Sequence, residues 1–337
     1  MQYFVVQEMP VKYRVFATRP MPQAVLDFLA PHCDVQMQGQ DVPVPPDELE
    51  RICRTHKIEG LLVAGGRVPA ELIRAAAQLR VVANCSVGYD NVDLAECTKR
   101  GILVTNTAGS LDDTTADLAF ALLLAVARRL GEAERFLREG QWKHWRFSLL
   151  MGADVHHKTI GIYGFGNIGR MMARRATGFA MRILYHSRHR APENVEREVG
   201  AEYRDRESLI READFLSLHV PLTAESRHLI GEQELGWMKP TAFLINTARG
   251  PVVDEEALAA ALKAGRIAGA GLDVFENEPQ IHRELLKIDS NIVLLPHVGS
   301  ATEETRTRMA MQASRNLLAA LAGERPPNLI NVEALRA

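Results

Sequence analysis

The stretch that decides the fold is "KTIGIYGFGNIGRMMARRATGF", residues 158–179. An apolar run typical of a strand ends at Gly164, and Gly166 and Gly169 follow where a helical pattern begins. Gly164 allows a tight turn, Gly166 lets the backbone approach a pyrophosphate, and Gly169 lets helix and strand pack closely. The stretch predicts a strand, a phosphate-binding loop and a helix in that order.

The first turn of this predicted helix completes the loop. The amides of Asn167 and Ile168 lie at the positive end of the helix, where a phosphate binds. Glycines punctuate many strand–helix turns, so the glycines alone are weak evidence. The strand before them, the helix after them and a second strand at the expected distance together favour dinucleotide binding.

The second strand of the unit ends in an unusual way, in "MRILYHSRHR", residues 181–190. An acidic residue about 20 positions beyond the glycines commonly binds the ribose hydroxyls of NAD. Here His186 is followed by Ser187 and Arg188. A hydroxyl and a guanidinium suit a 2′-phosphate, which a carboxylate would repel. A solvated basic strand end is the alternative, and we predict NADP(H) as the preferred cofactor with NAD(H) possible.

Strand-like and helix-like runs alternate along the whole chain. At 337 residues the chain is longer than one hydrophobic core usually serves. The alternation predicts an α/β protein of two doubly wound parallel-sheet domains. Between them we expect one continuous helix over residues 110–137, apolar around most of its circumference and therefore buried between domains or between subunits.

Composition excludes several classes of protein. The formal net charge is −2, so no basic surface argues for nucleic acid or acidic lipid. The longest strongly apolar stretch, residues 118–127, is too short to span a bilayer, and residues 1–10 lack the pattern of a signal peptide. The four cysteines have no CxxC spacing, which suits a reducing compartment, so we expect a cytoplasmic protein. His156 and His157 have no further ligand at metal-binding spacing, and no metal is predicted.

Three polar residues follow predicted strands in the C-terminal half. Arg249 closes "FLINTARG", Glu278 lies in "LDVFENEP", and His297 closes "VLLPHVG". Each alone could be a surface charge, a turn residue or a structural histidine. Together they supply what reduction of a 2-keto acid needs, since a cation polarises the ketone, an imidazolium donates a proton, and a carboxylate favours the charged imidazole.

The chain resembles the D-isomer-specific 2-hydroxyacid dehydrogenases. The matching motifs extend over most of the chain; they are "SVGYDNVD", "NTAGSLDDTTADLAFALLLAVARR", "GFGNIG", "HVPLT", "NTARGPVVDEEAL", "AGLDVFENEP" and "PHVGSATEETR". The resemblance implies that Arg249, Glu278 and His297 are the catalytic residues. It implies a Rossmann domain, residues 109–298, inserted into a flavodoxin-like substrate domain, residues 1–108 and 299–337.

The resemblance also assigns the binding residues. It implies that the amides of Val87 and Gly88 bind the substrate carboxylate, with Ser300 also at the substrate. On the cofactor side it implies that Asp273 and the backbone around Thr247 hold the nicotinamide carboxamide side and that Pro221 lies near the adenosine. We expect Thr115 to be a further cofactor-binding residue.

Within the family the chain is most similar to bacterial glyoxylate/hydroxypyruvate reductases. We therefore expect NADPH-dependent reduction of small 2-keto acids, with 2-ketogluconate reduction as an alternative. A nucleotide-sensing scaffold, as in a corepressor branch of the family, is the alternative from another class. The arm at residues 140–152 carries Trp142 and Trp145, which are either core aromatics or interface residues. We expect a homodimer in which Trp145 reaches the neighbouring subunit's substrate pocket.

Overall fold

A computed structural model describes residues 12–336 of the chain. They form two compact units, one of the described residues up to 111 and from 302 onward, and the other of residues 112–301. The borders predicted from sequence were 108/109 and 298/299. Residues 1–10, in which no signal peptide was predicted, lie outside the described residues.

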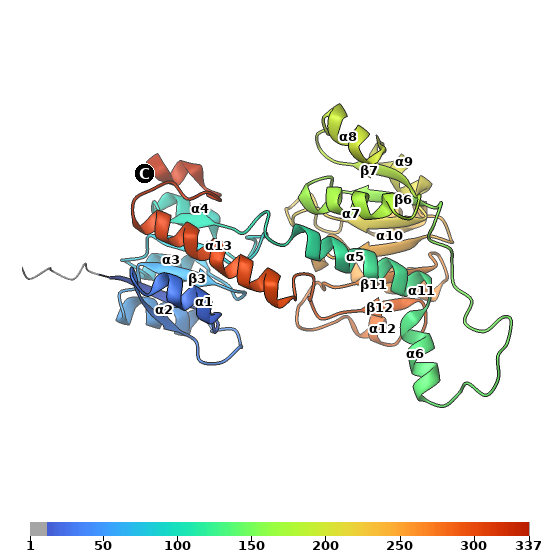
Figure 1. Cartoon of the computed structure of the whole chain (residues 1–337), viewed down its shortest axis with the longest axis horizontal. Helices are drawn as coiled ribbons and strands as arrows, with labels where there is room; N and C mark the ends of the chain where they lie inside the picture. Colours follow the sequence, from blue (N-terminus) through green and yellow to red (C-terminus); the bar gives the residue numbers. More distant parts are fainter. Residues whose placement is uncertain (1–11, 337) are drawn as a thin grey trace, which may run out of the picture. The chain divides into compact units, whose positions relative to one another are not determined.

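The first unit is a five-stranded parallel sheet in the order β2-β1-β3-β4-β5, the flavodoxin-like order (Figure 1). Its strands are β1 (Tyr13–Ala17), β2 (Cys33–Met37), β3 (Gly60–Val63), β4 (Val81–Asn84) and β5 (Leu103–Thr105). Its helices are α1 (Gln23–Leu29), α2 (Pro46–Thr55), α3 (Ala70–Ala75), α4 (Leu94–Lys99), α13 (Glu303–Leu321) and the 3₁₀ turn η2 (Val332–Arg336).

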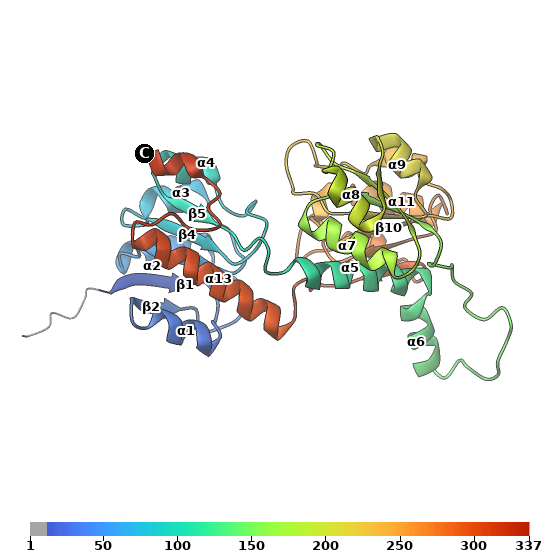
Figure 2. The same cartoon turned by 45° about the horizontal axis from the view of Figure 1, so that its top comes forward.

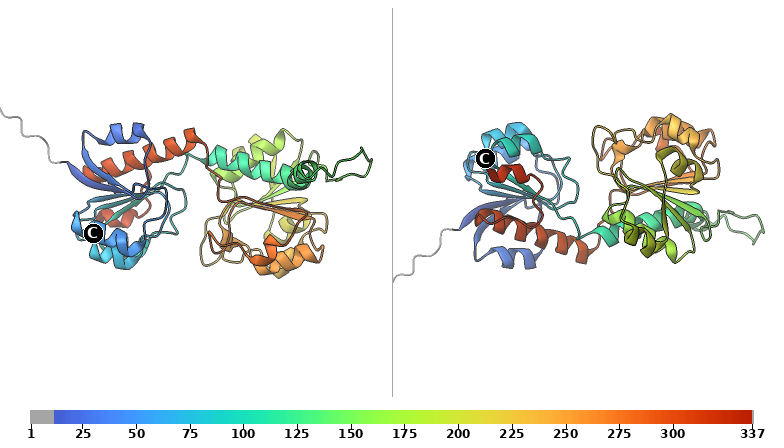
Figure 3. Two further views of the ribbon diagram at one scale, coloured as in Figure 1. Left: turned by 90° about the horizontal axis from the view of Figure 1, so that it is seen from below. Right: turned by 90° about the horizontal axis from the view of Figure 1, so that it is seen from above.

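Helices cover both faces of this sheet, as Figure 3 shows. Helices α1 and α13 pack on one face, where Leu317 and Leu321 of α13 join Val15 and Val81 of the sheet. Helices α2, α3 and α4 pack on the other face. Helix α13 begins at Thr302, whose hydroxyl accepts a hydrogen bond from the amide of Thr305. The C-terminal helix thus belongs to the core of the N-terminal unit.

The second unit (Figure 2) contains a seven-stranded parallel sheet, whose strand order is β12-β11-β10-β9-β6-β7-β8. Its strands are β6 (Thr159–Tyr163), β7 (Arg182–His186), β8 (Ala201–Tyr203), β9 (Phe215–Leu218), β10 (Phe243–Asn246), β11 (Gly269–Leu272) and β12 (Ile292–Leu294). Its helices are α5 (Asp112–Ala127), α6 (Leu130–Arg138), α7 (Asn167–Thr177), α8 (Glu193–Val199), α9 (Arg206–Glu212), α10 (Glu232–Trp237), α11 (Glu255–Lys263), α12 (Arg283–Leu286) and the 3₁₀ turn η1 (Gly250–Val252).

This strand order is that of a Rossmann fold, in which the chain reverses direction across the sheet between β6 and β9. Helices α5, α7 and α8 pack on one face and α9, α10 and α11 on the other. The predicted fold of two doubly wound parallel sheets is confirmed. Strands β2 and β8 lie outside the strand-like runs of the sequence, which are residues 13–18, 60–66, 80–88, 102–109, 158–164, 181–187, 214–222, 242–250, 269–276 and 291–299.

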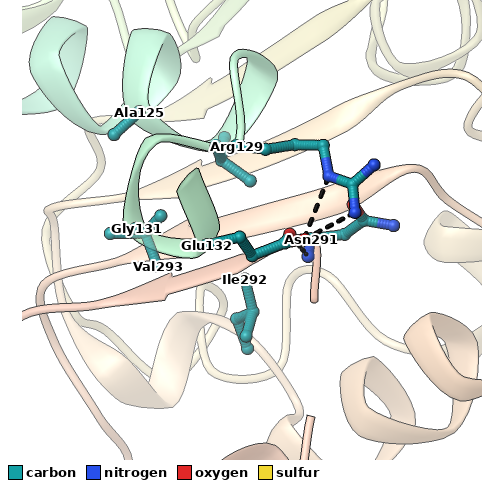
Figure 4. A pocket seen from close by; sticks show the side chains of 8 residues that line it. Ala125, Arg129, Gly131, Glu132, Asn291, Ile292 and Val293 are labelled. Atoms are coloured by element: carbon teal, nitrogen blue, oxygen red, sulfur yellow. Dashed lines mark hydrogen bonds and ion pairs between the residues drawn. The ribbon is translucent and has the colours of Figure 1, made fainter. Parts of the chain in front are cut away.

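The single helix predicted over residues 110–137 is wrong, because the chain breaks between α5 and α6. Arg129 adopts a left-handed backbone, with φ of 54°. Its guanidinium lies 2.6 Å from the Glu132 carboxylate, and that carboxylate accepts a hydrogen bond from the amide of Asn291 (2.8 Å; Figure 4). The apolar circumference of α5 is explained within its own unit, where it packs on α7, β10 and β11.

Candidate active site

The three predicted catalytic residues follow adjacent strands of the seven-stranded sheet. Arg249 lies beyond β10, Glu278 lies between β11 and α12, and His297 lies beyond β12. These strands are neighbours and parallel, so their carboxyl ends meet at one edge of the sheet. The topology therefore brings together residues that are 48 positions apart in the sequence (249 to 297).

Glu278 and His297 form a hydrogen-bonded pair. Nδ1 of His297 lies 2.8 Å from Oε2 of Glu278, while Oε1 of Glu278 accepts a hydrogen bond from the amide of Phe275 (3.0 Å). Burial alone would raise the pKa of Glu278, but the contact with His297 and the charge of Arg249 hold this pKa below its ordinary value. An ionised carboxylate only accepts hydrogen bonds, so Nδ1 carries the proton toward Glu278 and Nε2 is the ring nitrogen left to act on another group.

A buried carboxylate fixes the turn that carries His297. His297 has a left-handed backbone (φ 54°), and its amide donates to the carbonyl of Asp273 (2.8 Å). The two side-chain oxygens of Asp273 accept hydrogen bonds from the amides of Val298 and Gly299, each at 2.8 Å. Burial raises the pKa of Asp273 above its ordinary value. The observed contacts of Asp273 are thus with the His297 turn, and its contact with a nicotinamide stays a prediction.

Asn246, which sequence reasoning missed, holds the backbone at Arg249. Its side-chain oxygen accepts from the amide of Ala248 (3.0 Å), and its side-chain nitrogen donates to the carbonyl of Arg249 (3.0 Å). This residue is buried at the end of β10. A polar residue closing an otherwise apolar strand was the only signal in the sequence that could have pointed to it.

The glycine loop has the shape that a pyrophosphate requires. Gly164 has φ of +98°, and a Cβ there would lie 2.4 Å from the carbonyl oxygen of His219. A Cβ at Gly169 would lie 2.1 Å from the carbonyl oxygen of Gly164. At Gly166, by contrast, a Cβ would meet nothing within 4 Å. Side chains are excluded where strand and helix touch, and open space remains at the middle glycine, where α7 begins with Asn167 and Ile168.

The remaining predicted cofactor residues lie at the same edge of the sheet. Thr247, directly after β10, is buried, and its hydroxyl has no hydrogen-bond partner among residues 12–336. Thr115 in α5 is buried, and its side chain lies beside Gly299. Pro221, beyond β9, is exposed. A buried hydroxyl without a partner fits a bound polar group, so these residues fit a nicotinamide nucleotide.

At the tip of β7 the basic residues have different surroundings. Arg190 pairs with Glu196 (2.8 Å), whose carboxylate also accepts a hydrogen bond from Tyr185 (2.6 Å). The hydroxyl of Ser187 donates to the carbonyl of His189 (2.5 Å). Arg188 is exposed and makes no ion pair within 4 Å among the described carboxylates. Of these arginines, Arg188 has its guanidinium available to a ligand.

In the first unit the loop after β4 turns its carbonyls inward. The carbonyl of Ser86 accepts from the amide of Thr107 (2.9 Å), and that of Val87 accepts from the side chain of Asn106 (2.8 Å). The carbonyl of Gly88 accepts from the side chain of Asn84 (2.8 Å). Within the described part of the chain, the amides of Val87 and Gly88 donate to no acceptor. Two such amides fit the carboxylate binding that the family resemblance implies for Val87 and Gly88, and this role stays a prediction.

The aromatic residues of the arm are exposed, so their interpretation as core residues is wrong. Trp145 is 72% exposed, and Phe147, which contacts it edge to face, is 86% exposed. Together with α6, this arm extends away from the sheet of its unit (Figures 1 and 2). Ser300, the other predicted substrate residue, is half-buried just after the His297 turn.

Two further observations concern ligands and membranes. No group of three or more histidine, cysteine or acidic side chains among the described residues could hold a metal ion. Within the same residues, no helix is long and apolar enough to cross a membrane.

Residues 120–299 match the model of the NAD binding domain of D-isomer specific 2-hydroxyacid dehydrogenases. The chain belongs to this family. The predicted membership is thereby confirmed, and the dehydrogenase is an oxidoreductase with an NAD-binding Rossmann domain.

Relatives of this dehydrogenase match it from end to end. It is 50% identical over 331 residues to a glyoxylate reductase of Thermococcus litoralis, an alignment that covers 96% of this chain and 98% of the relative. A crystal structure of a protein from Thermus thermophilus is 43% identical, with a TM-score of 0.87 over 94% of this chain and 99% of that one. The NADPH-dependent glyoxylate/hydroxypyruvate reductase of Sinorhizobium meliloti, solved with NADP and malonate, is 34% identical, with a TM-score of 0.83 over 96% and 98%.

Proposed function

We propose that this dehydrogenase reduces small 2-keto acids, glyoxylate and hydroxypyruvate among them, to D-2-hydroxy acids, with NADPH preferred to NADH. The observation that carries the proposal is the 2.8 Å pair of Glu278 and His297, beside the charge of Arg249, in the NAD-binding unit. A reduced nicotinamide bound there supplies the hydride. The names of the relatives, glyoxylate reductase and glyoxylate/hydroxypyruvate reductase, support the substrate class.

The side chains divide the remaining work. The guanidinium of Arg249 orients the keto acid and polarises its carbonyl. His297 donates a proton from Nε2 to the oxygen that becomes the hydroxyl, while Glu278 stabilises the imidazolium through Nδ1. The amides of Val87 and Gly88 bind the substrate carboxylate. We accordingly propose that the five-stranded unit contributes Val87 and Gly88 to substrate binding, that Arg249 and Ser300 are further substrate residues, and that the seven-stranded unit binds the cofactor.

The preference for NADPH rests on the tip of β7. Arg188 is exposed there beside the hydroxyl of Ser187, and no carboxylate replaces them. A guanidinium matches the geometry of a phosphate and binds it with a charge-assisted hydrogen bond. Thr115, Thr247 and Asp273 contribute to the nicotinamide side and Pro221 to the adenosine side.

Oxidation of NADPH and NADH with glyoxylate, hydroxypyruvate and 2-ketogluconate tests this function. We expect glyoxylate and hydroxypyruvate to give the highest kcat/KM, with NADPH ahead of NADH. A higher kcat/KM with 2-ketogluconate would favour the sugar-acid reductase instead. Binding of either nucleotide without turnover of any keto acid would favour the nucleotide-sensing scaffold.

The exposed arm supports a homodimer. Trp142 is 54% exposed and Trp145 72% exposed, which is unusual for tryptophans of a monomer. We propose that the arm packs on a second copy of the chain and that Trp145 reaches the neighbouring subunit's substrate pocket. Sedimentation equilibrium of the purified protein tests this; a monomer at micromolar concentration would contradict it.

The cysteines support a reducing compartment. Cys33, Cys53, Cys85 and Cys97 are all free and buried. Burial raises the pKa of the Cys85 thiol to about 12, which leaves it in its unreactive protonated form. We propose that the enzyme works in the cytoplasm.

A further inference from the structure

Glu255 is a buried carboxylate to which the proposed reaction gives no role. It is the first residue of α11 and is 4% exposed. Its Oε1 accepts a hydrogen bond from the amide of Glu276 (2.8 Å), and its Oε2 accepts one from the amide of His282 (3.3 Å). In return, Oε1 of Glu276 accepts a hydrogen bond from the amide of Glu255 (3.0 Å). One side chain therefore joins the two ends of the segment 276–282.

That segment carries Glu278. It is a tight turn, in which the amide of Gln280 donates to the carbonyl of Asn277 (2.9 Å). The carboxylate of Glu278 extends from the turn to Nδ1 of His297 at 2.8 Å. The ends of the turn are fixed by Glu255, so the place of the Glu278 carboxylate relative to His297 depends on those two hydrogen bonds together with the one from the amide of Phe275 to Glu278 (3.0 Å).

The same stretch of chain that carries Glu255 also carries Arg249. Between them Gly250 lies against the turn, because a Cβ there would stand 1.8 Å from the carbonyl carbon of Phe275 and 2.4 Å from the amide nitrogen of Glu276. The backbone of Gly250, the residue after Arg249, is thus in direct contact with the start of the segment that carries Glu278. Glu255, five residues after Gly250, contacts the same segment through its hydrogen bonds with the amides of Glu276 and His282.

The charged or titratable side chains near Glu255 are those of Asp254, Glu276, His228 and His282. Nε2 of His228 lies 3.1 Å from Glu276, and its Nδ1 lies 3.9 Å from Asp254. His282 donates its backbone amide to Glu255, and its side-chain Nδ1 is buried without a hydrogen-bond partner among the described residues. No arginine or lysine pairs with Glu255 among residues 12–336, so its partners are backbone amides. Such a carboxylate is held for its geometry rather than for a salt bridge.

We propose that Glu255 is a positioning residue for proton transfer, whose carboxylate fixes the turn 276–282 and thereby keeps Glu278 on His297. This inference rests on the proposed roles of Glu278 and His297. It assigns a task to a residue of "DEEAL" that touches neither substrate nor cofactor.

Glu255→Gln tests the proposal because it keeps the size of the side chain. One carboxylate oxygen is replaced by the NH2 group of the side-chain amide. This group cannot accept a hydrogen bond from a backbone N–H, so the bond with either Glu276 or His282 is lost. We expect kcat/KM for glyoxylate to fall about tenfold at alkaline pH and the basic limb of its pH profile to move to lower pH. Activity at acidic pH and the Kd for NADPH, measured by fluorescence titration, should change less than about twofold. Glu256→Gln, which changes the exposed neighbour in the same helical turn, should leave the profile unchanged.

A fall in activity that is equal at every pH, with the basic limb in place, would overturn the proposal and leave Glu255 a merely structural residue. Should the glutamine variant fail to fold, Glu255→Asp goes through the same assays, since it keeps the charge but withdraws the carboxylate by one methylene. In the double variant Glu255→Gln/Glu278→Gln, the basic limb of the pH profile should lie at the same pH as in Glu278→Gln alone, because Glu255 acts through Glu278. Shifts of the basic limb that add up in the double variant would contradict this. If Glu278→Gln leaves the basic limb of the pH profile in place, the proposed function fails. If Glu278→Gln shifts the basic limb and Glu255→Gln does not, only the positioning role of Glu255 is refuted.

Discussion

Replacing Glu278 by glutamine isolates the charge of the carboxylate that contacts His297. Glutamine keeps the length of the side chain and an oxygen that can accept from the amide of Phe275, as Glu278 does at 3.0 Å. It removes the negative charge 2.8 Å from Nδ1 of His297. In the reductive direction His297 must be protonated to act, so the charge matters most where imidazole begins to lose its proton.

The size of the effect follows from the distance and the exposure of the pair. Two unit charges at about 4 Å interact by about 4 kcal/mol at an effective dielectric constant near 20, and by about 1 kcal/mol in bulk water. The side chains of His297 and Glu278 are 49% and 36% exposed, so solvent screens much of the attraction. We take about 1.4 kcal/mol, which corresponds to one pH unit and a factor of ten.

The assay is kcat/KM for glyoxylate at saturating NADPH, measured from acidic to alkaline pH. We expect the basic limb of Glu278→Gln to lie about one pH unit lower, with most activity retained at acidic pH. His297→Ala should lose activity at every pH, because no other proton donor is proposed. An unmoved basic limb in Glu278→Gln would refute the pairing of Glu278 with His297 as the source of the imidazolium.

Three further changes test other parts of the molecule. Arg188→Ala should lower kcat/KM with NADPH about ten- to a hundredfold through loss of a charge-assisted hydrogen bond, with NADH as the internal control; equal losses with both cofactors would make Arg188 structural. Trp145→Ala should alter the ranking of keto acids more than the Kd for NADPH, and an unchanged ranking would remove Trp145 from the substrate pocket. Burial lowers the pKa of His219 from 6.5 to about 4, so the unfolded chain takes up this proton first as pH falls. The contribution of His219 to stability is therefore complete above pH 6.5 and is lost toward pH 4, by about 3 kcal/mol at most. In urea titrations His219→Gln should lose less stability than the wild type across that window, and parallel pH curves would contradict the assignment.

The sequence carries the parts of this fold that depend on local pattern. The glycine loop and the apolar strands of the Rossmann unit are legible because each residue there is constrained by its own turn, strand or helix. Strand β2 escaped prediction because it lies at a sheet edge and only Cys33 is fully buried in it. The break at Arg129 also escaped, because Glu132 and Asn291 stabilise it across the fold and no proline marks it.

The site shows the same division. Arg249, Glu278 and His297 could be proposed because chemistry-bearing residues closing strands are visible in the sequence. Glu255 could not, since an acidic residue in the first turn of a helix is expected from the helix dipole alone. Only the turn that packs on it, twenty-one residues further along the chain at Glu276, gives it a partner.

The five-stranded unit is built from two separate segments of the chain, and this affects the order in which the two units can fold during synthesis. Helix α13 supplies Ala313, Leu317 and Leu321 to a core whose strands, residues 13–105, precede the helix, residues 303–321, by about two to three hundred residues. Until that helix has left the ribosome, α1 alone covers one face of the sheet, while the seven-stranded unit is already complete in sequence. Because domains fold as units as they emerge, the seven-stranded unit can fold first. The N-terminal segment keeps apolar side chains exposed until α13 has emerged. A nascent chain that has emerged as far as residue 301, with α13 still inside the ribosome, would therefore present a folded Rossmann domain attached to an N-terminal segment with exposed apolar side chains.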